Sequence, residues 1–240
     1  VRVTSPLFGL LSPMVVTSRM SFFSDALGHS AFTGIAIGTL CGLADPLWMA
    51  VLLAAVFALL FTYVRRKSNM ASDTVIGVFS STAVALGIFI ATFGGGSFTQ
   101  YNSLLIGDIL SVEPAKIALL AVILLVVVLL WLCSFNQLML SSIHPALADS
   151  RGVGVFWQEA VFSAAIAVVV TVSMTWVGLL VINSLLVLPA AAARNVARNM
   201  RQYHLFSLLG AVISGLAGPM TPYYIGPSAG AAITLHLGGW

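Results

Sequence analysis

The sequence predicts an all-α protein with several membrane-spanning helices. Hydrophobic residues make up 60% of the 240 residues and charged residues only 7%, whereas about a quarter of the residues in soluble domains are charged. The apolar residues form long continuous runs rather than short alternating segments, which indicates helices rather than a β-barrel. At roughly 20 residues per span, about seven to nine helices fit in this length. We expect one transmembrane domain over residues 1–240.

The N-terminal half contains one short apolar segment and three longer ones. Residues 5–18 are short for a span, and Pro6 and Pro13 are expected to bend or break them. We interpret this segment as the remnant of a first helix that is truncated at the N-terminus. The next three helices are predicted at residues 25–43, 46–63 and 72–93.

The C-terminal half is less regular. Residues 100–112 carry Asp108 and are too short to span, so a short interfacial or re-entrant helix is predicted there. The remaining predictions are a span from residue 117 to about Cys133, a loop at 134–153, two spans in 155–193 broken near Ser173–Trp176, a span at 205–222 and a last helix from 228.

Two clusters of basic residues predict the orientation. Arg65, Arg66 and Lys67 follow one predicted span, and Arg194, Arg198 and Arg201 come four predicted spans later. An even number of spans places both clusters on the same side, and the positive-inside rule makes that side cytoplasmic. The net charge of +3 therefore fits a multi-pass protein of the inner (cytoplasmic) membrane and gives no indication of nucleic-acid binding.

Asp25 and His29 are the candidate metal ligands. On a helix, a spacing of four places both side chains on one face, and a carboxylate with an imidazole suits zinc, manganese or iron(II) without distinguishing among them. The helix is rich in small residues, and Gly34 and Gly38 form a small-xxx-small pair that favours close helix packing in a membrane. The alternative is that Asp25 is an acid near a helix start and His29 a hydrogen-bonded packing residue. Two ligands also leave a four-coordinate site incomplete.

Several stretches resemble the membrane subunits of bacterial ABC importers for zinc, manganese and iron. The most specific are RMSFFSDALGHSAFTGIA from Arg19 to Ala36 and VGLLVINSLLVLPAAAAR from Val177 to Arg194. Weaker matches are Ser72–Val78, Leu105–Leu110 and Gly226–Ile233. Gly28 stands where the family usually has serine, and Thr33 near where it often has proline, so a straighter helix is expected.

The resemblance implies a fold like the cobalamin and siderophore permeases and a homodimer around a central pathway. It implies two cytoplasmic ATPase subunits and an extracytoplasmic metal-binding protein as partners. The transported divalent metal would then be the only ion bound, with no permanent cofactor. The resemblance also strengthens the assignment of Asp25 and His29 as ligands for that metal.

A second candidate site follows the predicted helix 177–188, which is expected to end at Pro189. The segment contains Pro189, Ala190, Ala191, Ala192, Arg194 and Arg198. Alanines favour a helix, and the arginines recur at helical spacing. One interpretation is an ordinary loop whose arginines only fix topology. The other is a short helix that couples the pore to the ATPase, as a loop at this place does in the wider family.

Other functions are less well supported. A self-contained secondary metal carrier is the alternative transport mechanism, but it calls for an internal repeat or broken helices, and no clear repeat is present. An intramembrane metalloenzyme would need a His-Glu-x-x-His motif or its equivalent, which the sequence lacks. The sequence also has no Gly-x-x-x-x-Gly-Lys-Ser/Thr motif, so ATP hydrolysis is expected in partner subunits.

Overall fold

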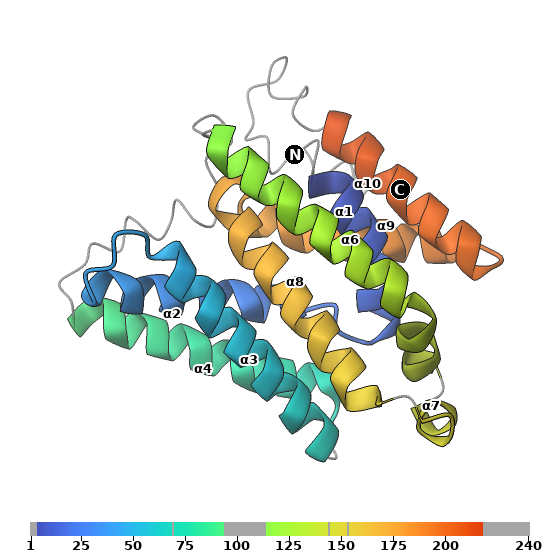
Figure 1. Cartoon of the computed structure of the whole chain (residues 1–240), viewed down its shortest axis with the longest axis horizontal. Helices are drawn as coiled ribbons and strands as arrows, with labels where there is room; N and C mark the ends of the chain where they lie inside the picture. The colour runs from blue at the N-terminus through green and yellow to red at the C-terminus, as the bar shows by residue number, and fades with distance from the viewer. Residues whose placement is uncertain (1–3, 69, 94–113, 144, 153, 218–240) are drawn as a thin grey trace. The chain divides into compact units, whose positions relative to one another are not determined.

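The computed structural model describes residues 4–68, 70–93, 114–143, 145–152 and 154–217 (Figure 1). Every regular element in these ranges is a helix, which confirms the predicted all-α class. The helices are α1 Thr4–Thr17, α2 Phe23–Leu40, α3 Leu47–Lys67, α4 Ser72–Phe93, α6 Pro114–Ile143, α7 Pro145–Ser150, α8 Val155–Val177, α9 Leu179–Val196 and α10 Met200–Ala217. The short helix predicted at 100–112, with Asp108, and the last helix predicted from 228 lie outside the described residues.

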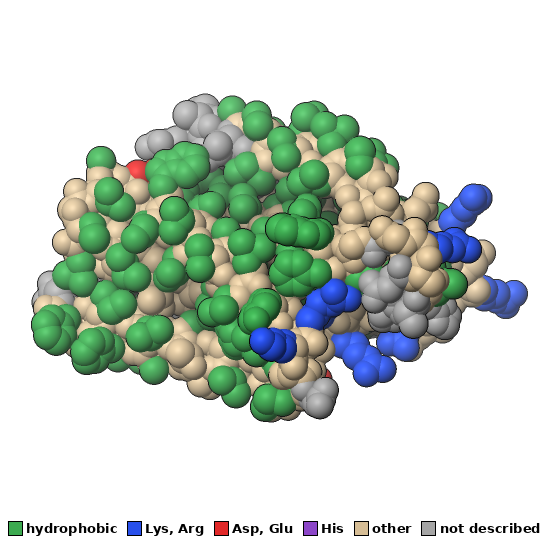
Figure 2. Space-filling model, turned by 60° about the horizontal axis from the view of Figure 1, so that its bottom comes forward, with side chains coloured by type: hydrophobic (Ala, Val, Ile, Leu, Met, Phe, Trp, Pro, Cys, Tyr) green, Lys and Arg blue, Asp and Glu red, His purple; other side chains and the backbone are tan. Residues whose placement is uncertain are grey.

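Within the described residues, α3, α4, α6, α8 and α9 are long and apolar enough to cross a membrane. Helices α2 and α10 have 18 residues each, or about 27 Å of helix, but their sequences are more polar. Large hydrophobic side chains are exposed along the spans, and they cover much of the face shown in Figure 2. Such a surface matches a hydrocarbon environment, so the described helices support a multi-pass membrane protein.

The chain forms two compact units. The terminal unit comprises Val1–Ser21, Ser103–Leu125 and Ser173–Trp240, and the central unit comprises Phe22–Asn102 and Val126–Val172. In the terminal unit, α1, α9 and α10 pack against one another. Gly9 permits this contact, because a Cβ atom there would lie 2.6 Å from the Cβ of Ala211.

In the central unit, α2 packs against both α3 and α4. The predicted role of Gly34 and Gly38 in close packing is confirmed, since a Cβ atom at Gly34 would lie 2.5 Å from the Cα of Ala50 and one at Gly38 3.1 Å from the Cα of Pro46. Small residues also recur every fourth position on the buried face of α3, at Ala50, Ala54, Ala58 and Thr62. Without bulky side chains between them, the helices gain contact along their backbones.

Of the two effects expected from the prolines, a bend or a break, the break is wrong. Helix α1 continues from Thr4 to Thr17 with Pro13 inside it. Pro6 lies in the first turn, where a backbone N–H has no helical partner to lose. Pro13 deprives the Gly9 carbonyl of its usual i→i−4 donor, and the Ser207 hydroxyl of α10 donates to that carbonyl at 2.9 Å instead. The neighbouring helix therefore allows α1 to continue through its proline.

Two boundaries in the second half also differ from expectation. Helix α6 continues to Ile143 rather than ending near Cys133, so much of the predicted loop 134–153 is helical. Residues 155–193 do form two helices, but the break falls at Gly178 instead of Ser173–Trp176. Gly178 has φ 85° and ψ 146°, a conformation open essentially only to glycine.

Candidate functional site

Asp25 and His29 lie one turn apart near the start of α2, as the sequence predicted. Asp25 is in the first turn, and its Oδ2 atom lies 3.5 Å from Nε2 of His29. A tetrahedral metal with bonds of about 2.0–2.2 Å holds two of its ligand atoms roughly 3.4 Å apart. The two side chains therefore already have nearly the separation that a single bound metal requires.

The pair reaches the surface of an otherwise buried stretch of helix. The side chains of His29 and Asp25 are 30% and 44% exposed, whereas Ala26, Leu27 and Ser30 between and beside them are buried. An arriving ion can reach the carboxylate and the imidazole without unpacking α2.

Thr33 connects this part of α2 to its neighbour. Its hydroxyl donates to the Ala83 carbonyl of α4 at 2.8 Å and to the His29 carbonyl at 3.1 Å. Helix α2 continues as one helix through this position, where the resembling family often has proline. The hydroxyl fixes α2 against α4 one turn beyond the candidate ligands.

The geometry fits both interpretations of the pair. Among the described residues, no group of three or more His, Cys, Asp or Glu side chains is placed to hold a metal. Water or other ligands would have to complete a four-coordinate site. The position of Asp25 in the first turn of α2 also suits the positive end of the helix dipole, which is the structural role considered from sequence.

The alanine–arginine segment differs from its predicted form. Helix α9 does not end at Pro189 but continues through it to Val196. Ala190 is buried, Ala191 is exposed and Ala192 is half-buried. Arg194 occupies the last turn of α9, while Arg198 lies between α9 and α10. The arginines therefore do not share one continuous helical face, although all are exposed.

The last turns of α9, past Pro189, are held by contacts with two neighbouring helices. The Ala190 N–H, which follows the proline, donates to the Ser12 hydroxyl of α1 at 3.2 Å. Ala190 and Ala193 also pack against Tyr203 of α10 in a small core cluster. Contacts with α1 and α10 therefore hold the last turns of α9 in place.

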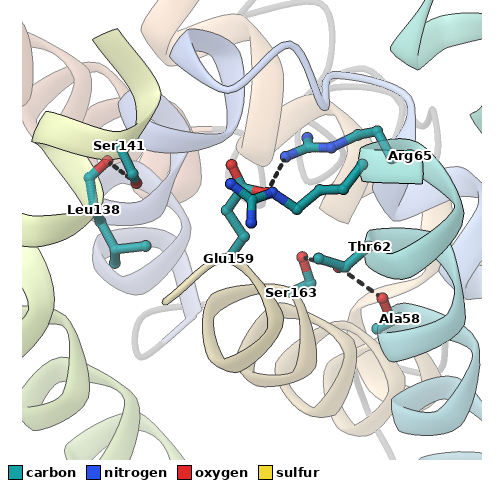
Figure 3. A network of polar contacts seen from close by, with 8 residues as sticks. Ala58, Thr62, Arg65, Leu138, Ser141, Glu159 and Ser163 are labelled. Atoms are coloured by element: carbon teal, nitrogen blue, oxygen red, sulfur yellow. Dashed lines mark hydrogen bonds and ion pairs between the residues drawn. The ribbon is translucent and has the colours of Figure 1, made fainter. Parts of the chain in front are cut away.

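A polar network that sequence reasoning missed joins α3 to α8 (Figure 3). Arg65 Nη2 lies 2.9 Å from Glu159 Oε2, and Arg66 Nε lies 3.7 Å from the same atom. One turn further into the helices, the Thr62 hydroxyl donates to the Ser163 hydroxyl at 3.1 Å. The sequence indicated charges at two helix ends, but only the fold shows that they meet.

These features define a helical, polytopic inner-membrane protein that carries an Asp–His pair, the candidate metal ligands, on one of its helices. The chain matches the ABC 3 transport family over residues 2–238. It therefore belongs to that family, which confirms the resemblance seen in its motifs.

Its relatives include membrane proteins of zinc uptake and manganese import systems. The chain is 24% identical to the high-affinity zinc uptake system membrane protein ZnuB of Haemophilus influenzae, with 97% of this chain and 87% of the relative covered. It is 29% identical to the manganese import system permease ScaB of Streptococcus gordonii, with 95% and 81% covered. Among solved structures, PsaBC of Streptococcus pneumoniae in complex with Fab superposes with a TM-score of 0.83 at 26% identity, covering 99% of this chain and 85% of that one.

Proposed function

We propose that this chain is the pore subunit of an ABC importer that carries zinc or manganese into the cytoplasm. Membership of the ABC 3 transport family and the names of the zinc and manganese relatives support this proposal. Iron(II) is supported only by ligand chemistry, because the Asp–His pair suits it as well. Within the proposal, ATP is hydrolysed by separate cytoplasmic subunits, and this subunit supplies the path for the ion.

In this proposal Asp25 and His29 form a transit site for the metal. The single observation that carries it is their 3.5 Å separation on the accessible part of a helix that is otherwise buried. Two protein ligands bind an ion less tightly than a closed four-ligand site, and a transport path must release what it takes up. The ion would keep water or other ligands in its remaining positions while it passes.

The proposed partners are two ATPase subunits, an extracytoplasmic metal-binding protein and a second copy of this chain. The last turns of α9, with Ala191 and the arginines exposed, are the proposed contact for an ATPase. Arginine side chains there would pair with carboxylates on that partner. The family match does not favour a self-contained secondary carrier. Such a carrier would take up metal even without ATP.

The test is metal uptake by the complex reconstituted with its ATPase. Asp25→Asn and His29→Gln preserve size while removing a metal ligand, and each is expected to lower zinc or manganese uptake at least about tenfold, since even outer-shell changes at metal sites cost about 10- to 100-fold. Thr39→Val is the matched control, because Thr39 is exposed on α2 and its hydroxyl bonds only to its own helix. Uptake at the level of the unaltered protein in either ligand variant, once assembly is verified, would show that the pair is structural.

A further inference from the structure

The face of α2 that carries the candidate metal ligands begins with an exposed aromatic side chain. Phe22 is the N-cap residue of α2, and its carbonyl accepts from the Ala26 N–H at 3.3 Å, so it lies on the same helical cylinder as Asp25 and His29. At about 100° per residue, Phe22 is about 20° from His29 and about 60° from Asp25 around the helix axis. These three side chains form one stripe along α2, called here the ligand stripe.

The two directions along the ligand stripe differ in exposure. Phe22, seven residues before His29, is 66% exposed. Ala36, seven residues after His29 and again about 20° from it around the axis, is 1% exposed. The side chains of the candidate ligands, at 30% and 44%, belong to the exposed part. The ligand stripe is therefore accessible at the start of α2 and covered beyond the middle of the helix.

Neither core packing nor contact with lipid explains the exposure of Phe22. The next residue, Phe23, is the core residue of this turn: it is fully buried, and its ring centroid lies 4.7 Å from that of Phe61. Ionisable side chains inside a membrane face the protein interior or a water-filled cavity, so a stripe that contains Asp25 and His29 does not face lipid. Phe22 is thus a large apolar side chain on the face of α2 that an ion would follow.

We propose that Phe22 forms the cytoplasmic barrier of the metal path, one helical turn from the transit site. The inference rests on the proposed function, in which the Asp25–His29 pair binds the ion in passing. An ion with two protein ligands keeps water in its other positions, and an apolar side chain beside it opposes the passage of that water, as hydrophobic constrictions do in channels. The start of α2 is the cytoplasmic end in the predicted orientation, because α2 runs towards the turn that contains Asp45.

Three variants separate a barrier from a packing role. Phe22→Ala removes the proposed barrier, and Phe22→Leu keeps a large apolar side chain in its place. Phe93→Ala is the matched control, since Phe93 is also an exposed phenylalanine at the end of a helix in the central unit. The residues four and seven positions before it, Phe89 and Leu86, are exposed and apolar as well, which is the pattern of a lipid-facing surface.

The test is the rate at which a thiol at position 29 is modified from each side of a membrane that holds the assembled transporter. Cys41→Ser and Cys133→Ser remove the two exposed thiols, and His29→Cys supplies the reporter. A cationic, membrane-impermeant methanethiosulfonate reagent is added to inside-out vesicles. Phe22→Ala should raise the modification rate about tenfold, the effect of lowering the entry barrier by about 1.4 kcal/mol. Phe22→Leu and Phe93→Ala should leave the rate unchanged.

An unchanged modification rate in Phe22→Ala would overturn the proposal. An equal rise in spheroplasts, where the reagent reaches only the other side of the membrane, would do the same, because it indicates a loosened fold rather than a lost barrier. A rise of similar size in Phe93→Ala would also overturn it. The modification rate does not depend on transport, so its failure is distinguishable from failure of the transit site, which the uptake of the ligand variants measures.

Discussion

At the scale of single residues, serine hydroxyls bond to the backbone at both prolines that lie inside helices. Pro13 interrupts the hydrogen-bond ladder of α1, and Pro189 interrupts that of α9. In a membrane, no water is present to satisfy the backbone groups that a proline releases. Ser207 donates to the Gly9 carbonyl, and Ser12 accepts from the Ala190 N–H. All four residues are in the terminal unit, so the two serines link its three helices by polar contacts.

Removal of the Ser207 hydroxyl is expected to destabilise the protein by about 1–3 kcal/mol, because the buried Gly9 carbonyl loses its partner. Ser207→Ala measures this loss, and a double-mutant cycle with Pro13→Ala identifies its origin. Pro13→Ala restores the N–H that can bond Gly9, so Ser207→Ala should cost less in that background. Thermal unfolding of the detergent-solubilised variants measures the stability lost on Ser207→Ala in each background. Equal costs in both backgrounds would show that the hydroxyl does not compensate for the proline.

At the scale of elements, the end of α9 has two faces with different roles. Ala190 and Ala193 pack against Tyr203 and belong to the core. Ala191, on the other face, is exposed. Because α9 continues to Val196 as one helix, a movement at its cytoplasmic end would be transmitted along the span. A rigid continuous helix suits the proposed coupling role at least as well as the separate short helix expected from sequence.

Ala191→Trp is expected to reduce retention of the ATPase in a pull-down and to lower metal uptake, since a large side chain would stand where the partner docks. The core should tolerate the change, because Ala191 lies outside it. Leu180→Trp is the control, since Leu180 is 54% exposed at the opposite end of the same helix. If both variants bind the ATPase and transport metal equally, the arginines fix topology only. Coupling would then have to run through residues 134–153, in the end of α6 and in α7.

At the scale of the whole molecule, the described helices agree with the predicted orientation. Within the described ranges, four candidate spans, α4, α6, α8 and α9, lie between the basic cluster at the end of α3 and the arginines around the end of α9. By the positive-inside rule, we predict that both clusters face the cytoplasm. The same prediction places the turn between α2 and α3, which contains Asp45, on the other side of the membrane.

Cysteine labelling should reproduce this arrangement. Cys41 and Cys133 are both exposed free thiols, so serine replaces them first. In spheroplasts, an impermeant maleimide should label the Asp45→Cys variant at once. Met70→Cys and Asn199→Cys, at exposed positions after α3 and α9, should react only after permeabilisation. Labelling of the Asn199→Cys variant in sealed spheroplasts would contradict an even number of spans between the two clusters.

Patterns that depend on neighbours within one or two helical turns were determined by the sequence alone. Continuous apolar runs determined the helical class, and the basic cluster Arg65–Lys67 marked the end of α3. The spacing of Asp25 and His29 determined that they share a face, and Gly34 with Gly38 marked a close helix contact. Each of these follows from helix geometry and from the cost of placing charge in hydrocarbon.

Features that depend on residues far apart in the chain were decided only by the tertiary structure. Local rules predict that Pro13 bends or breaks α1 and that α9 stops at Pro189, because proline removes a hydrogen bond. Helix α1 continues since the hydroxyl of Ser207, 198 positions from Gly9, satisfies the carbonyl that Pro13 releases. Helix α9 continues while the Ala190 N–H, beside its proline, donates to Ser12 of α1. The Arg65–Glu159 pair likewise needs α3 and α8 to meet. In a membrane, the hydrogen-bond and ion-pair partners of backbone groups and charges come from the assembled helices. No local sequence pattern indicates which neighbouring helix will provide the partner.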